Sequence, residues 1–274
     1  MNFEALQHIV ASNVQGRVAS ALCRVEFWEK ALRLFMKASR IVIVTGFYIK
    51  RAGASETDGP PGAVALGRAA ARVGKSVVLL TDSKNYSCLK ACSRSVNGPL
   101  TISVDDYEKI PTDVELLVFV ERPGHAADGC YYDMKGSDIS DVVAPLDRAA
   151  EAFLKKGVPV LGIGDGGNEA GMGLLFEALA ARLPHYEPYL SRVAATVCLP
   201  IDVSNWGAYA LTAVLSAFYR RWLGLDEGEE RTMLSAMLSA GAVDGVTGRP
   251  DMSVDGILLS ELDEMTLKIR NWYS

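Results

Sequence analysis

Short, continuous apolar runs that alternate with helical patterns constrain the fold of this chain more than any other feature. Runs of strand length lie at residues 40–46, 77–81, 100–104, 116–121, 158–163 and 196–201. Helical patterns separate them at about 62–73, 83–95, 145–156, 169–182 and 206–223. Strands that are apolar throughout are typical of a parallel sheet covered on both faces. We therefore expect an α/β fold, a three-layer αβα sandwich with a mainly parallel sheet.

The two ends of the chain are predicted to be helical. Apolar residues between Val18 and Met36 recur at intervals of three and four, which predicts an N-terminal helix at 14–38. Residues 228–273 contain further helical stretches that we expect to pack on the sheet or to form a homodimer contact. No repeat or long linker divides the sequence, so residues 1–274 are predicted to form a single domain.

Charge and apolar patterning exclude two classes of partner. The chain has 28 Lys and Arg against 33 Asp and Glu, and no basic run interleaved with aromatics, so we expect no nucleic-acid binding. The apolar runs are far shorter than the ~20 residues that span a bilayer. The N-terminus lacks the features of a secretion signal, and the five cysteines form no CxxC pair. These features predict a cytoplasmic protein with reduced thiols and no membrane contact.

Ligands of open parallel sheets bind beyond the carboxyl ends of the strands, where loops gather around helix N-termini. The first such loop contains Glu56, Thr57, Asp58 and Gly59, followed by two prolines and an Ala-rich helix. Thr57 or Asp58 is expected to cap that helix, and the N–H groups beyond it can hold a carboxylate. A helix cap with a stiff turn explains Asp58 and the prolines equally well, but it does not explain Glu56 and Thr57.

The second loop, which follows residues 116–120, combines acids, a guanidinium, an imidazole and paired tyrosines. Arg122 is a candidate clamp for a substrate carboxylate, and Glu121 or Asp128 can transfer protons. Tyr131 or Tyr132 can donate a hydrogen bond. The alternative is a structural pairing of Glu121 with Arg122 and ordinary tyrosine packing.

The third and fourth loops add oxygen ligands and further helix starts. Gly166 and Gly167 permit close approach of the backbone to a ligand, while Asp165, Asn168 and Glu169 offer hard oxygen atoms to a divalent cation or to ammonium. In the fourth loop, Ser204 or Asn205 is expected to cap a helix that begins near Trp206. We expect these four loops to converge along one rim of the sheet.

Four separated blocks of sequence resemble the D-glutamate cyclase family. They are residues 56–63, residues 121–124 with 126–129 and 131–132, residues 164–169 with 171–173, and residues 203–207 with 209–211. Four blocks in the family's order are far more specific than a single Gly-rich loop. The resemblance implies conversion of D-glutamate to 5-oxo-D-proline with loss of water, so the expected partner is a small dicarboxylic amino acid.

This reaction needs a base for the ammonium group, an acid for the departing oxygen, and neutralisation of a carboxylate. Under the resemblance, the candidates are Asp58 or Glu169 as base, Asp128 or Tyr131 as acid, and Arg122 for the α-carboxylate. Glu121 is a further catalytic candidate, and Asp165 with Glu169 is a candidate pair for Mg²⁺ or Mn²⁺. The expected substrate contacts are Glu56, Thr57, Gly59, Arg122, Gly166, Gly167, Asn168, Ser204 and Asn205.

Three other functions compete with this interpretation. Residues 164–169 also resemble the Mg²⁺-binding loop of haloacid-dehalogenase-type phosphatases, but the chain has no DxD nucleophile motif after residues 41–45. A dinucleotide-dependent oxidoreductase is disfavoured because Gly162-Ile-Gly164 lacks a clean GxGxxG motif combined with an acid at the end of the next strand. A protein that binds a small carboxylate or amino acid without converting it remains the non-enzymatic alternative.

Overall fold

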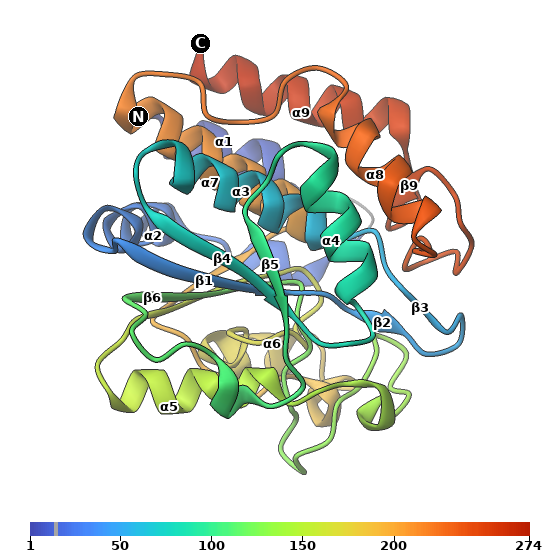
Figure 1. Cartoon of the computed structure of the whole chain (residues 1–274). Coiled ribbons are helices and arrows are strands. Elements are labelled where there is room, and N and C mark those ends of the chain that lie inside the picture. The colour runs from blue at the N-terminus through green and yellow to red at the C-terminus, as the bar shows by residue number, and fades with distance from the viewer. Residues whose placement is uncertain (14–15) are drawn as a thin grey trace.

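A six-stranded parallel sheet lies at the centre of the computed structural model, which describes residues 1–13 and 16–274 (Figure 1). Every neighbouring pair of strands in this sheet is parallel. In spatial order, the strands are β5 (Leu100–Ser103), β4 (Ser76–Thr81), β1 (Arg40–Thr45), β6 (Leu116–Val120), β7 (Val160–Gly164) and β8 (Val197–Pro200). The predicted parallel sheet is therefore confirmed.

Helices cover both faces of the sheet, as the continuous apolar strands predict. Alternate residues of β1 enter different cores: Ile41 and Ile43 pack into one, and Val42 and Val44 into the other. One face is covered by α2 (Val25–Lys37), α3 (Pro60–Arg72), α4 (Tyr86–Ser95) and α7 (Ser204–Tyr219), and the opposite face by α5 (Ala149–Lys155) and α6 (Phe176–Arg182) (Figure 1). The three-layer αβα sandwich is confirmed.

The order of the strands determines where the loops separate. From β1 the chain proceeds to β4 and β5 on one side, whereas from β6 it proceeds to β7 and β8 on the other. β1 and β6 are neighbours, so the loops that follow them diverge at the carboxyl edge of the sheet. Open α/β sheets bind their ligands at such a point.

The N-terminal helix predicted at 14–38 is not continuous. The described part has a 3₁₀ helix at Val18–Leu22 and then α2, and residues 14–15 lie outside the described residues. Cys23 and Arg24 separate the two with extended backbone. Apolar spacing did not reveal this break because a 3₁₀ helix also places every third residue on one face. The helix α1 (Phe3–Val10) was not predicted.

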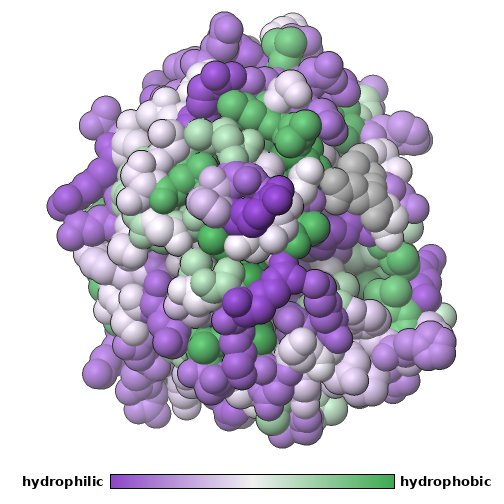
Figure 2. Space-filling model, turned by 90° about the vertical axis from the view of Figure 1, so that its right-hand side faces the viewer, coloured by the Kyte–Doolittle hydropathy of each residue, from purple (hydrophilic) through white to green (hydrophobic). Residues whose placement is uncertain are grey.

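The C-terminal segment contains α8 (Glu229–Ser239) and α9 (Leu259–Tyr273), close to the predicted stretches. Two short antiparallel ladders extend beyond the carboxyl edge of the sheet: β2 (Tyr48–Ile49) with β3 (Ala54–Ser55), and β9 (Ser253–Val254) with β10 (Ile257–Leu258). Hydrophilic side chains cover much of the face seen in Figure 2. Among the described residues, no helix combines the length and apolarity needed to span a membrane.

Close contact between α3 and α7 gives a prediction about Gly62. An added Cβ at Gly62 would lie 2.9 Å from both Asn205 Cα and Ala208 Cβ. Gly62→Ala is therefore expected to destabilise the fold by about 1–3 kcal/mol through overpacking, although Ala normally favours a helix over Gly. Gly67→Ala in the same helix is a comparison with milder contacts, since the atom nearest to its added Cβ would be Leu79 Cδ2 at 3.0 Å. Chemical denaturation measures both, and a Gly62→Ala protein at least as stable as the parent would contradict the prediction.

Candidate active site

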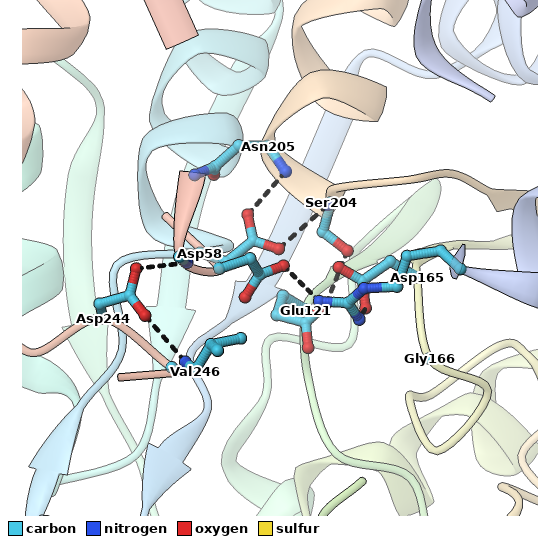
Figure 3. Close-up of polar contacts among 12 residues, drawn as sticks. Asp58, Glu121, Asp165, Gly166, Ser204, Asn205, Asp244 and Val246 are labelled. Carbon is cyan, nitrogen blue, oxygen red and sulfur yellow. Dashed lines mark hydrogen bonds and ion pairs between the residues drawn. The ribbon is translucent and has the colours of Figure 1, made fainter. Parts of the chain in front are cut away.

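The structure brings the four predicted loops together at the carboxyl edge of the sheet. Carboxylate oxygens of Asp58, Glu121 and Asp165, which follow three different strands, lie within 4.8 Å of one another. Ser204 and Asn205, at the start of α7, contact Asp58 (Figure 3). All five side chains are buried, so their charges interact in an environment that screens them less than water does.

Asp58, which lies just before α3, caps α7, and Asn205, in the first turn of α7, caps α3. The two oxygens of Asp58 accept hydrogen bonds from the backbone N–H groups of Ser204 (3.0 Å) and Asn205 (2.9 Å), at the start of α7. In return, Asn205 Oδ1 accepts from the N–H groups of Gly59 (3.0 Å) and Gly62 (2.8 Å). Neither cap is the local one predicted from the sequence. Pro60 and Pro61 have no N–H, so Gly62 supplies the first N–H within α3, and a side chain from α7 reaches it.

The crossed caps make Asn205 a structural residue whose loss is measurable. Asn205→Ala removes the acceptor for two buried N–H groups and the donor to Thr57 O, and is expected to cost on the order of 2–3 kcal/mol of unfolding free energy. Asn271→Ala, at an exposed position of α9, is the control and should change stability little. Urea unfolding compares the two, and equal midpoints would rule out the proposed capping role.

The backbone conformation of Glu121 directs its side chain toward this cluster. Its φ of 44° is in the left-handed region, and its Oε2 accepts a 2.6 Å hydrogen bond from Ser204 Oγ. A Cβ at Gly59 would lie 2.7 Å from Glu121 Cβ, so the absence of a side chain there permits the approach. The structure thus gives Gly59 a spatial role next to Glu121.

Glu169 organises its own loop. Its Oε1 accepts from Gly166 N (2.7 Å) and Asp165 N (3.3 Å), and its Oε2 accepts from Gly167 N (2.7 Å). The N–H groups of Gly166 and Gly167, predicted to contact substrate, are therefore directed to this carboxylate. Glu169 holds the turn and is not part of the group that Asp58, Glu121 and Asp165 form with oxygens within 4.8 Å of one another, so the geometry does not favour the predicted pairing of Glu169 with Asp165 around a metal.

Arg17 and Asp255 belong to the site and were not found in the sequence. The Arg17 guanidinium donates to Asp165 Oδ1 and, at 2.5 Å, to Asp255 Oδ2. Asp255 has a φ of 54° in the turn between β9 and β10. Neither residue follows a strand of the central sheet, so a search of strand ends could not reveal them. In the sequence, the Asp255-Gly256 pair indicates the turn that carries Asp255.

A cavity of about 380 Å³ lies against these groups. Its acidic lining comprises Glu56, Glu121, Asp133, Asp165, Glu169 and Asp255, and its cations are Arg17, Lys50, Arg51 and Lys135. Two buried oxygens of lining residues, Glu56 Oε1 and Asn168 Oδ1, have no hydrogen-bond partner among the described residues. This volume suits a small molecule, and the lining offers both signs of charge to a zwitterion.

Burial raises the pKa values of the acids in this region. Glu56 and Glu121 have pKa values well above their ordinary value because burial disfavours the charged form and neighbouring carboxylates add to the effect. The pKa of Asp165 is also raised by burial, although Arg17 opposes the rise. Burial and Asp255 raise the pKa of Asp58 to about 7, against the two N–H groups that favour its ionised form. Burial and mutual repulsion therefore favour the protonated forms of these acids, and the pKa of Asp58 lies near neutral pH.

Arg122 does not line the cavity. It is fully buried and donates to Gly46 O (3.0 Å), Asp82 Oδ2 (2.5 Å) and Ala144 O (2.6 Å). These contacts join three loops and do not support the predicted role as a substrate clamp. The left-handed turn at Glu121 directs consecutive side chains to different places, which the sequence does not reveal.

Nine other predicted residues are also absent from the cavity lining: Thr57, Asp58, Gly59, Asp128, Tyr131, Gly166, Gly167, Ser204 and Asn205. Asp128 is exposed and accepts from Tyr132 OH (2.6 Å), which lowers its pKa. Tyr131 OH donates to buried Asp147 (2.6 Å). Burial is the main cause of the raised pKa of this phenol, and the charge of Asp147 adds to it. Thr57 Oγ1 donates to Ser253 O (2.8 Å). These positions support structural roles, so Asp128 and Tyr131 are poor candidates for the acid.

A family model and a curated relative indicate the same family. The model of the family described as D-glutamate cyclase-like, C-terminal, matches residues 6–270. A curated human protein, D-glutamate cyclase, mitochondrial, is 29% identical over 286 aligned positions, which cover 88% of this chain and 46% of that protein. The chain thus spans about half the length of this relative. A solved structure of an exopolyphosphatase-related protein from Bacteroides fragilis aligns with 92% of this chain and with 62% of that protein's chain, at 13% identity. Its TM-score of 0.33 is too low to support an argument.

Proposed function

The chain belongs to the D-glutamate cyclase-like family, and from this premise we propose that it converts D-glutamate to 5-oxo-D-proline and water. The observation that carries the proposal is the buried carboxyl group of Glu56, which lines the cavity and whose Oε1 has no hydrogen-bond partner in the described part of the chain. Asp255 lines the same cavity and contributes to the raised pKa of Glu56. Two nearby acids of unequal proton affinity suit a reaction that needs an acid and a base together.

The cyclisation moves two protons from nitrogen to oxygen. The ammonium group must lose one proton before its nitrogen can attack the γ-carboxyl carbon, and a second after the C–N bond has formed. The γ-carboxylate must gain two protons so that one oxygen leaves as water. No proton is gained or lost in the sum, so two protein groups that exchange protons with the substrate are sufficient.

We assign the first acceptor role to Asp255 and the first donor role to Glu56. Burial raises the pKa of Asp255, but its pairing with Arg17 opposes this rise and favours the ionised form, so Asp255 can take a proton from the ammonium group. Burial keeps Glu56 protonated, so it can donate to the γ-oxygen as the nitrogen attacks. Glu56 then receives the second nitrogen proton, and Asp255 passes its proton to the departing hydroxyl group. Both residues end in their starting states.

The cations of the cavity account for substrate binding. Lys50, Arg51 and Lys135 line the same space as the acids and can attract the two carboxylates, while the acidic wall accepts the ammonium group. Holding both ends of the substrate close together favours formation of a five-membered ring over reaction with water. This mixed lining replaces the single clamp that was expected at Arg122.

Mass spectrometry of each glutamate enantiomer after incubation with the purified chain tests the proposal. Loss of one water from D-glutamate is the expected result, with little conversion of the L enantiomer. Thermal stabilisation by D-glutamate without product would replace the enzyme with a binding protein. Hydrolysis of a phenyl phosphate ester without cyclisation would favour the phosphatase instead.

A further inference from the structure

Acidic groups outnumber cations in the buried part of the site. Glu56, Asp58, Glu121, Asp165, Glu169 and Asp255 are each at most 6% exposed. Arg17 is the guanidinium that pairs with two of them. Carboxylates this close repel one another unless a cation or a proton intervenes.

Three of these acids form the tightest group. Oxygens of Asp58, Glu121 and Asp165 lie within 4.8 Å of one another, so one ion between them can contact all three. Ser204 donates to Oε2 of Glu121, which leaves Oε1 without a hydrogen bond among the described residues. The two oxygens of Asp58 and those of Glu169 all accept backbone N–H groups, but only Asp58 belongs to the group within 4.8 Å.

A second observation, independent of the acids, also indicates a cation. The amide oxygen of Asn168 is buried and accepts no hydrogen bond from the described residues, while its Nδ2 donates to Tyr132 O at 2.8 Å. Asn168 is 3% exposed and lines the cavity. A Cβ at Gly166 would lie 2.8 Å from this oxygen, which places it beside the Asp165 turn. A neutral oxygen without a donor is a ligand that hard divalent cations accept.

We propose that Asp58, Glu121 and Asp165 bind one divalent cation of the Mg²⁺ or Mn²⁺ type, with Arg17 as its competitor for Asp165. Carboxylate and amide oxygens are the ligands that these hard ions prefer, and the set contains no thiolate or imidazole that would favour softer metals. Arg17 already satisfies part of the charge of Asp165, so the ion must displace or share that contact. A bound ion would also bring positive charge next to the cavity.

Titration of the chain with Mn²⁺ alone, followed by calorimetry and by the electron paramagnetic resonance of free Mn²⁺, tests this site. One ion per chain is expected. Glu121→Gln and Asp165→Asn should each weaken binding by about tenfold or more, because each removes an anionic ligand. Asp113→Asn, whose side chain is 77% exposed, is the control and should bind as the parent does.

Arg17→Gln tests the site through an expected gain of affinity, so the result does not depend on whether the ligand variants fold. Removal of the competing guanidinium should strengthen Mn²⁺ binding several-fold. No binding by the parent, equal affinity in Glu121→Gln, or weaker binding in Arg17→Gln would each overturn the proposal. No substrate is present in the titration, so a failed metal site and a failed cyclase assay are distinguishable.

Discussion

Glu56→Gln is expected to lower kcat for cyclisation of D-glutamate by about 10²–10⁴-fold. Gln keeps the size of the side chain but cannot donate the carboxyl proton, which Oε1, without a partner among the residues that the structure describes, is placed to offer. The KM should change less than kcat, since the cavity cations remain in place. Steady-state kinetics with product measured by mass spectrometry determines both constants.

Two further variants separate chemistry from structure at Glu56. Gly245→Ala adds a methyl group whose carbon would lie 2.3 Å from Glu56 Oε2, so the carboxyl must move and kcat should fall although Glu56 remains. Glu29→Gln, an acid on the exposed side of α2, should retain the parent rate. A Glu56→Gln enzyme with a parent kcat would exclude Glu56 as the proton donor.

The sheet was predictable because its signal is local. Each central strand is a run of apolar residues long enough to be buried on both sides, and each run appears in the structure within a few residues of its expected bounds. The break at Cys23 and Arg24 was not predictable in this way, because buried apolar residues continue on both sides of it, with Ala19 and Leu22 in one core and Trp28 and Ala31 in another. Backbone direction there is determined by packing, which apolar spacing does not record.

The sequence predicts the location of the site better than the identity of the residues that form it. Strand ends located Asp58, Glu121, Asp165 and Asn205, since parallel strands bring their carboxyl ends to one edge. Arg17 and Asp255 come from segments outside the sheet, and only folding brings them to Asp165. Arg122 adjoins Glu121 in sequence yet contacts Asp82, because the left-handed backbone at Glu121 turns the chain.

Glu230→Gln should make the protein more stable at alkaline pH. Glu230 is 3% exposed, accepts a 3.0 Å hydrogen bond from Tyr209 OH, and has an Oε2 without a partner among the described residues. Burial raises its pKa from 4.5 to about 8. The folded state therefore holds a proton that the unfolded state releases, so unfolding free energy falls as pH rises from about 4.5 to about 8 and then levels off.

Gln cannot ionise, so the unfolding free energy of the variant does not fall in this way as pH rises. Its advantage over the parent should grow with pH across that window and reach on the order of a few kcal/mol above pH 8. Urea unfolding at pH 5, 7 and 9 measures the difference, and a constant difference would contradict the assigned cause. The variant also has a use in enzymology. Activity that requires protonated Glu56 must fall as pH rises through the raised pKa of Glu56, and in Glu230→Gln this fall can be observed without loss of stability from the ionisation of Glu230.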